Sequence, residues 1–123
     1  MLYRYELYCD DEYQDVGFMQ DMCNIFSKDK AKELCYFFDK YLQIPKYCKF
    51  TERHTCAFFT ELGIRKFQKQ IQAIIKAYEE ETIFEVKCIE INEEEIEDAI
   101  LYKDKFQIIV KGSVVHKETT FIP

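Results

Sequence analysis

The chain has 123 residues, a length that fits one domain with a single hydrophobic core and leaves too little material for two. Hydrophobic residues make up 48% of it and aromatic residues 16%, with 3 Gly and 2 Pro, which excludes a disordered or low-complexity protein. The formal net charge of −6 repels nucleic acid on average and favours a cationic partner. We therefore expect a single globular domain over residues 1–123.

The apolar content comes in short runs that charged residues interrupt. A membrane-spanning helix needs about 18 consecutive apolar residues, and no run approaches that length. The opening MLYRYELYC alternates in polarity, whereas a secretory signal has a basic start followed by an apolar block. We expect a cytoplasmic protein that does not associate with a membrane.

Six cysteines are distributed along the chain, each inside or beside an apolar segment such as LCYFF or TCAFF: Cys9, Cys23, Cys35, Cys48, Cys56 and Cys88. A free thiol in such a setting behaves as a small hydrophobic side chain, so we expect these residues to be reduced. Cys48, His54 and Cys56 contain residue types that zinc prefers, but no C-x-x-C pair completes a tetrahedral set. The sequence therefore predicts neither a metal site nor a cofactor.

Alternating polarity predicts the first strand over residues 3–9. One face carries Tyr3, Tyr5, Leu7 and Cys9, and the opposite face carries Arg4 and Glu6. The acidic cluster that begins at Asp10 ends this strand. A short helix entered at Gly17 is expected next, because the spacing of the following apolar residues is helical: Phe18, Met19, Met22, Ile25 and Phe26.

Two longer helices are predicted from their caps and apolar periodicity. Ser27 is the expected N-cap of a helix through Leu42, which Ile44-Pro45 terminates. Thr60 is the expected cap of a second helix over residues 64–78, whose apolar stripe is Ile64, Phe67, Ile71, Ile74, Ile75 and Tyr78. Negative charges such as glutamates 79–81 are unfavourable at the C-terminal end of a helix, where the helix dipole is negative. We therefore expect this helix to have ended or to fray by there.

The remaining apolar segments are typical of strands. HTCAFFT has no polar face, so it is expected in the middle of the sheet. IFEVKCIEI is expected to place Phe84, Val86 and Cys88 on one face, against Glu85 and Lys87. ILYKDKFQIIVKG predicts a hairpin that turns at residues 103–105, and residues 113–123 form either an edge strand or a tail.

Together these elements predict an α+β domain. We expect a mostly antiparallel sheet of about five strands with two main helices packed on one face. The glycines are isolated, so no phosphate-binding loop is present. His54 and His116 are the available imidazole bases, and neither has an evident nucleophile and acid beside it. A non-enzymatic protein is favoured, with a small enzyme of unknown reaction as an alternative.

The charges are divided unevenly along the chain. Residues 27–76 carry 11 Lys or Arg against 5 acids, whereas residues 77–98 carry 10 acids against Lys87 alone. The acidic segments, which we expect to bind a basic partner groove as a nucleic acid would, contain Glu79, Glu80, Glu81, Glu93, Glu94, Glu95, Glu97 and Asp98. An alternative is a basic helix face that contacts phosphates or an acidic partner, formed by Arg65, Lys66, Lys69 and Lys76. The competing interpretation is that both sets are solvent-facing charges.

Nine Tyr and eleven Phe residues exceed what a small sheet and two helices must bury, so a homo-oligomer is a further hypothesis. Tyrosines at the margin of the core would account for them equally well.

In its compactness, its acidity and its LYKDKFQIIV hairpin, the chain resembles the small, mostly uncharacterised acidic proteins of phages and mobile elements of low-GC bacteria. Such proteins include anti-defence inhibitors that occupy the nucleic-acid site of a bacterial immune effector. The resemblance implies an inhibitor that binds a macromolecule, and it implies no catalytic residue.

Overall fold

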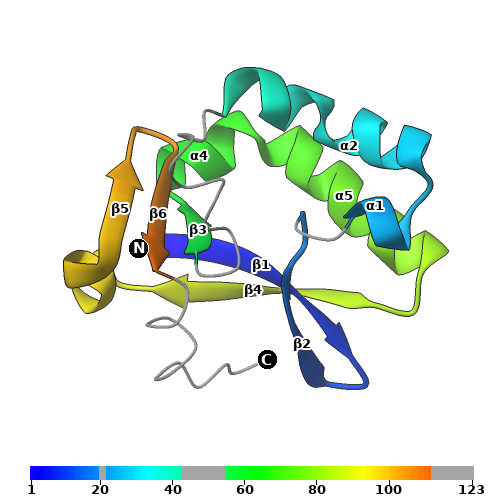
Figure 1. Cartoon of the computed structure of the whole chain (residues 1–123), viewed down its shortest axis with the longest axis horizontal. Helices are drawn as coiled ribbons and strands as arrows, with labels where there is room; N and C mark the ends of the chain where they lie inside the picture. Colours follow the sequence, from blue (N-terminus) through cyan, green and yellow to red (C-terminus); the bar gives the residue numbers. More distant parts are fainter. Residues whose placement is uncertain (20–21, 43–54, 112–123) are drawn as a thin grey trace. The chain divides into compact units, whose positions relative to one another are not determined.

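The structure, a computed structural model, describes residues 1–19, 22–42 and 55–111. Its strands are β1 (Leu2–Cys9), β2 (Glu12–Gly17), β3 (Thr55–Phe59), β4 (Glu85–Ile91), β5 (Ile100–Lys103) and β6 (Gln107–Lys111) (Figure 1). The helices are α1 (Met22–Ile25), α2 (Lys28–Tyr41), α4 (Glu61–Lys66), α5 (Gln68–Glu81) and the 3₁₀ helix η2 (Glu93–Ala99). An antiparallel sheet combined with several helices confirms the predicted α+β class.

The strands pair in the order β2-β1-β3-β6-β5, and β4 pairs with β1. The chain divides into two compact units, and β1 contributes to both. Among the described residues, the first unit contains 1–4, 55–66 and 89–111, and the second contains 5–19, 22–42 and 67–88. The prediction of one domain over the whole chain stays a prediction. Within these described ranges, every helix is too short or too polar to span a membrane.

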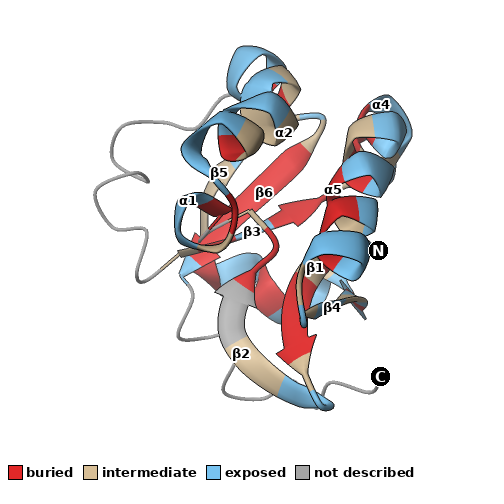
Figure 2. Cartoon of the chain, turned by 90° about the vertical axis from the view of Figure 1, so that its right-hand side faces the viewer, coloured by how far each residue is buried: buried red, intermediate tan, exposed pale blue. Residues whose placement is uncertain are grey.

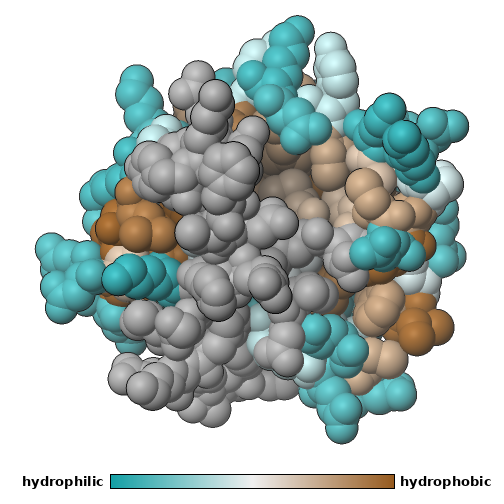
Figure 3. Space-filling view, viewed as in Figure 1, coloured by the Kyte–Doolittle hydropathy of each residue, from teal (hydrophilic) through white to brown (hydrophobic). Residues whose placement is uncertain are grey.

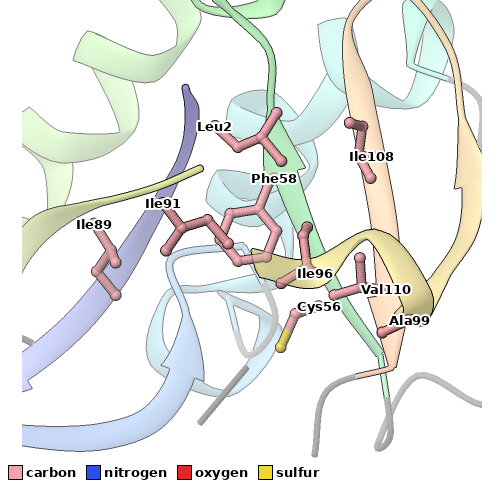
Figure 4. Close-up of a cluster of buried hydrophobic side chains, with 9 residues drawn as sticks. All are labelled: Leu2, Cys56, Phe58, Ile89, Ile91, Ile96, Ala99, Ile108 and Val110. Atoms are coloured by element: carbon pink, nitrogen blue, oxygen red, sulfur yellow. The ribbon is translucent and has the colours of Figure 1, made fainter. Parts of the chain in front are cut away.

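In the first unit, β3 pairs with β6 along its whole length, from Thr55 opposite Lys111 to Phe59 opposite Gln107. Its central place between β1 and β6 confirms the prediction made from its lack of a polar face. The core of this unit joins residues from several strands and from η2: Leu2, Cys56, Phe58, Ile89, Ile91, Ile96, Ala99, Ile108 and Val110 (Figure 4). This cluster therefore fixes η2 to the sheet.

The predicted hairpin at residues 103–105 is confirmed, because β5 and β6 are antiparallel neighbours. The Asp104 carboxylate accepts hydrogen bonds from the backbone N–H groups of Phe106 (2.8 Å) and Gln107 (2.9 Å), which closes the turn. Thr60 caps α4 as predicted, since its hydroxyl accepts from the N–H of Gly63 at 3.1 Å. Gly63 lies so close to this turn that a Cβ would overlap the carbonyl of Phe106.

In the second unit, residues 5–9 of β1 and β2 form a hairpin, with Tyr8 opposite Tyr13. The predicted short helix begins later than expected, because Gly17 ends β2 and the helix α1 covers Met22–Ile25. The physical reason is the turn at Asp10 and Asp11, whose φ angles of 51° and 66° reverse the chain. Asp tolerates this left-handed conformation, and two consecutive residues of positive φ suit the twist of a hairpin.

The helices α2 and α5 pack against each other in the second unit (Figure 1). The rings of Phe38 and Phe67 stack at 5.0 Å, and Tyr78 contacts Phe26 edge-on at 4.9 Å. The buried Tyr78 hydroxyl donates to the carbonyl of Phe18 at 2.6 Å, which satisfies its polar group. Ser27 caps α2 as predicted, accepting from the N–H of Lys30 at 3.2 Å.

The second predicted helix differs from the observed one at both ends. The structure has two helices in place of the predicted one, because the helix is interrupted at Phe67: α4 ends at Lys66 and α5 begins at Gln68. In addition, α5 continues through Glu81, which corrects the prediction of fraying at residues 79–81. Thr82 stabilises this end, because its backbone N–H and its hydroxyl both donate to the carbonyl of Tyr78.

The predicted faces of two strands are also wrong. In β1, Arg4 is 7% exposed and Glu6 is 0% exposed, whereas Tyr3 and Tyr5 are only partly buried. The Arg4 guanidinium donates to the carbonyl of Ala57 at 3.2 Å, and this hydrogen bond offsets part of the cost of burial. In β4, Cys88 is exposed, while Ile89 and Ile91 enter the core of the first unit.

Candidate functional site

The acidic run after β4 forms the 3₁₀ helix η2 and is not merely an extended connection. At its start, the Glu95 carboxylate accepts a hydrogen bond from the backbone N–H of Asn92 at 3.1 Å. Ile96 and Ala99 are 4% and 5% exposed and belong to the core of the first unit. Three glutamates in the first turn suit the positive end of the helix dipole.

The two buried residues leave the remaining side chains of η2 directed away from the core. Glu94, Glu95, Glu97 and Asp98 are exposed, and Glu93 is partly exposed. Lys103 Nζ lies 2.6 Å from a carboxylate oxygen of Glu93. Among the residues that the structure describes, Glu94, Glu97 and Asp98 form no ion pair. We call the five carboxylates the acidic helix surface: Glu93, Glu94, Glu95, Glu97 and Asp98.

The other predicted acidic residues lie in the second unit, in the last turn of α5. Glu80 pairs with Lys76 at 3.8 Å, and Glu81 pairs with Lys30 of α2 at 3.5 Å. Glu79 is exposed. Lysines thus pair with two of these three glutamates. In the first unit, by contrast, three carboxylates of the acidic helix surface form no ion pair within the described residues.

The alternative basic face is not presented by one continuous helix. Arg65 and Lys66 belong to α4 in the first unit, whereas Lys69 and Lys76 belong to α5 in the second. Lys66 Nζ lies 5.0 Å from the centroid of the Phe106 ring, a cation–π geometry that occupies it within its own unit.

The candidate metal residues Cys48 and His54, and also His116, lie outside the described residues. Cys56 is buried in the core of the first unit. Within the ranges that the structure describes, no three His, Cys, Asp or Glu residues form a group that could hold a metal ion. The described cysteines are free thiols: Cys9, Cys23, Cys35, Cys56 and Cys88.

Two groups in the second unit have shifted pKa values. Burial, with smaller contributions from Asp39 and Cys23, raises the pKa of the Cys35 thiol to about 11. The Cys35 Sγ lies 3.2 Å from Met22 Sδ, so this residue packs as a neutral thiol. Burial also raises the pKa of Tyr8, and the charge of Glu6 adds to the shift. A raised thiol pKa disfavours a nucleophilic role for Cys35.

A small charged cluster beside the β1–β2 hairpin was not predicted from the sequence. Lys87 Nζ lies 4.6 Å from the centroid of the Tyr8 ring and 3.0 Å from a carboxylate oxygen of Asp11. The Lys87 side chain is 16% exposed, so the ring and the carboxylate compensate its burial. Strand alternation could not reveal this cluster, because Lys87 and Asp11 are far apart in sequence.

Comparisons with known proteins identify no relative: no family model, no curated protein and no solved structure matches the chain.

Proposed function

We propose that this protein is a non-enzymatic binding protein that presents the acidic helix surface to a basic groove of a macromolecular partner. The observation that carries this proposal is the anchoring of η2. Ile96 and Ala99 are held in the core of the first unit, while four of the five carboxylates are exposed. Charges held on an anchored helix lose less conformational freedom on binding than charges on a loose segment.

The spacing within η2 suits recognition by cations. Side chains three residues apart on a 3₁₀ helix are aligned, with a rise of about 6 Å between them. Glu94 and Glu97 have this spacing, and Asp98 follows directly. Such a row offers successive acceptors to the lysines and arginines that normally bind phosphates. An inhibitor of the anti-defence type, acting in the cytoplasm on a nucleic-acid-binding protein, is the form of this function that the sequence resemblance favours.

The alternatives have less support. Direct nucleic-acid binding would use cations that are divided between α4 and α5, in a protein of net charge −6. A salt-sensitive gel shift that Lys69→Glu plus Lys76→Glu abolishes would replace our proposal with this one. A homo-oligomer is favoured by a separate observation, the exposed aromatic side chains Tyr36 and Tyr41 of α2.

The test of the acidic helix surface replaces only the carboxylates that have no structural contact. The variant Glu94→Gln/Glu97→Gln/Asp98→Asn keeps the Glu93–Lys103 pair and the Glu95 cap. A matched control, Glu61→Gln/Glu85→Gln/Glu90→Gln, removes the same charge from exposed positions elsewhere. The wild type is used to capture binding proteins from a bacterial lysate, with and without single-stranded DNA as a competitor.

We expect a protein that the wild type and the control capture, that DNA displaces, and that the η2 variant fails to capture. Equal capture by all three proteins would contradict the proposed site. A third variant, Glu79→Gln/Glu80→Gln/Glu81→Gln, determines whether the acidic end of α5 contributes to the same contact.

A further inference from the structure

The outward side of α2 carries aromatic and charged side chains that the acidic helix surface does not involve. Tyr36 is 63% exposed and Tyr41 is 43% exposed, among the most exposed large hydrophobic residues described. Exposed residues follow this side of α2 (Figure 2), and strongly hydrophilic residues project at the upper edge of the space-filling view, where Figure 1 places α2 (Figure 3). Tyrosine is favoured in contacts between proteins because its ring is apolar and its hydroxyl tolerates water.

Local contacts hold these aromatic side chains in place. Lys40 Nζ lies 6.0 Å from the centroid of the Tyr36 ring and 5.4 Å from that of Tyr41. The ring of Phe37 packs 4.5 Å from Tyr41 and contacts the buried Phe67 edge-on at 5.7 Å. The surface is thus connected to the packing between α2 and α5, and the packed rings of Phe37 and Tyr41 have little conformational freedom to lose on binding.

Helical geometry places two opposite charges at the centre of this surface. Glu33 and Lys40 are seven residues apart, which is close to two full turns, so they lie nearly on one line along α2. Tyr36 and Phe37 lie between them, on either side of that line. Both charged residues are exposed, and neither forms an ion pair with another residue in the described part of the chain. We call these four residues the α2 outer face: Glu33, Tyr36, Phe37 and Lys40.

The α2 outer face is complementary to itself. A twofold axis between Tyr36 and Phe37 would bring Glu33 of one copy against Lys40 of a second copy. This charge pair occurs twice, as a symmetric dimer requires. The two Tyr36 rings would lie together on one side of the charge pairs, and the two Phe37 rings on the other side. We propose that the α2 outer face is the contact between two copies of this chain, with the two α2 helices antiparallel.

This dimer is independent of the acidic helix surface and would exist whether or not that surface binds a partner. A contact centred on one helix per chain is small, so the dimer is weak and depends on protein concentration. Its charge pairs lie at the centre of the contact, and a charge reversal there therefore opposes association directly.

The experiment is sedimentation equilibrium of the full chain, from about 10 μM to about 1 mM. We expect the wild type to dimerise within this range. Glu33→Lys sets the introduced lysine against Lys40 at both central contacts, and Lys40→Glu sets the introduced glutamate against Glu33 at both. Each variant should therefore dimerise at least about tenfold more weakly than the wild type.

An equimolar mixture of the two variants tests the register itself. In the mixed dimer one central contact joins two introduced side chains and the other joins two native ones, and each again pairs a lysine with a glutamate. We therefore expect association to return. The double variant Glu33→Lys/Lys40→Glu should dimerise like the wild type for the same reason. The matched control is Glu85→Lys, which makes the same change of charge at an exposed position of β4 and should leave the dimer intact.

Several outcomes would overturn the proposal. They are a wild type that stays monomeric to about 1 mM, a dimer that both charge reversals leave unchanged, and a mixture that fails to recover association. Far-UV circular dichroism establishes that each variant keeps its helices.

Discussion

The two acidic segments of this protein have nearly the same composition and different physical situations. Glutamates 79–81 end the long helix α5, where the helix dipole is unfavourable, and Lys76 and Lys30 pair with two of them. The acidic helix surface begins at the favourable end of η2, has Lys103 as its one ion-pair partner within the described residues, and is anchored through Ile96. Two of the three carboxylates are paired in the first segment, whereas three of the five in the second form no ion pair within the described residues.

This difference shows which property separates a solvated acidic run from a surface suited to binding. Charge density in the sequence is similar in both segments. The first segment has one exposed carboxylate that forms no ion pair within the described residues, Glu79, whereas the second has three, together with two buried apolar residues in the same short helix. The distinction therefore rests on anchoring and compensation.

The largest expected effect comes from removing the anchor. Ile96→Ala leaves a cavity in the core of the first unit and should lower the free energy of unfolding by about 3 kcal/mol. The matched control is Ile83→Ala, next to the other acidic segment, because Ile83 is 77% exposed and its truncation should cost less than about 0.5 kcal/mol. Urea denaturation measures both. Equal losses would show that η2 is not anchored as described.

The C-terminal end of α5 depends on a polar contact. Removing this contact should lower the free energy of unfolding by less than Ile96→Ala does. Thr82→Val removes the hydroxyl that donates to Tyr78 (2.7 Å) and accepts from the N–H of Phe84 (3.0 Å). We expect the free energy of unfolding to fall by about 1.5 kcal/mol, because the backbone N–H of Phe84 loses its acceptor. Thr82→Ser retains the hydroxyl and is the control. Faster amide exchange near Glu81 in the valine variant alone would identify the end of α5 as the affected region.

The start of η2 is capped by the Glu95 side chain, and removal of this contact should lower the free energy of unfolding by about 1 kcal/mol. Glu95→Ala removes the acceptor for the N–H of Asn92, whereas Glu94→Ala removes a neighbouring exposed carboxylate that makes no such bond. Thermal unfolding of the two variants separates the cap from the charge. If both alanines had the same effect, the capping contact would contribute nothing.

Features set by neighbours in the sequence could be predicted. The Ser27 and Thr60 caps, the central strand β3 and the hairpin around Asp104 each depend on a few adjacent residues, and each was predicted correctly. The Asn92–Glu95 contact that begins η2 is equally local, and the spacing of these two residues is a signal that could have revealed the helix.

Features set by distant residues could not be predicted in the same way. Arg4 is buried because a carbonyl 53 residues away accepts its hydrogen bond. Glu81 stays helical beside Lys30, which belongs to another helix. The β1–β2 hairpin was missed because Asp10 and Asp11 take positive φ angles that glycine usually marks. For the candidate site, the carboxylates could be listed from the sequence, whereas their compensation and anchoring required the fold.

The two smallest expected changes in stability are opposite in sign, so they test the difference between the two acidic segments most directly. Glu81→Gln removes a partner of Lys30, and this exposed pair should contribute about 0.3 kcal/mol of stability at low salt. Glu97→Gln removes a charge that lies three and four residues from Glu94 and Glu93 on η2 and forms no ion pair within the described residues. Relief of this repulsion should raise stability by about 0.3 kcal/mol.

Both effects should shrink in 1 M salt, where the screening length falls to about 3 Å. Replicate chemical denaturation at low and high salt, with the two variants measured beside the wild type, resolves the difference between them. If Glu97→Gln destabilised the protein at low salt, the carboxylate would be compensated after all. The contrast between the two acidic segments, and with it the main support for η2 as a binding surface, would then be lost.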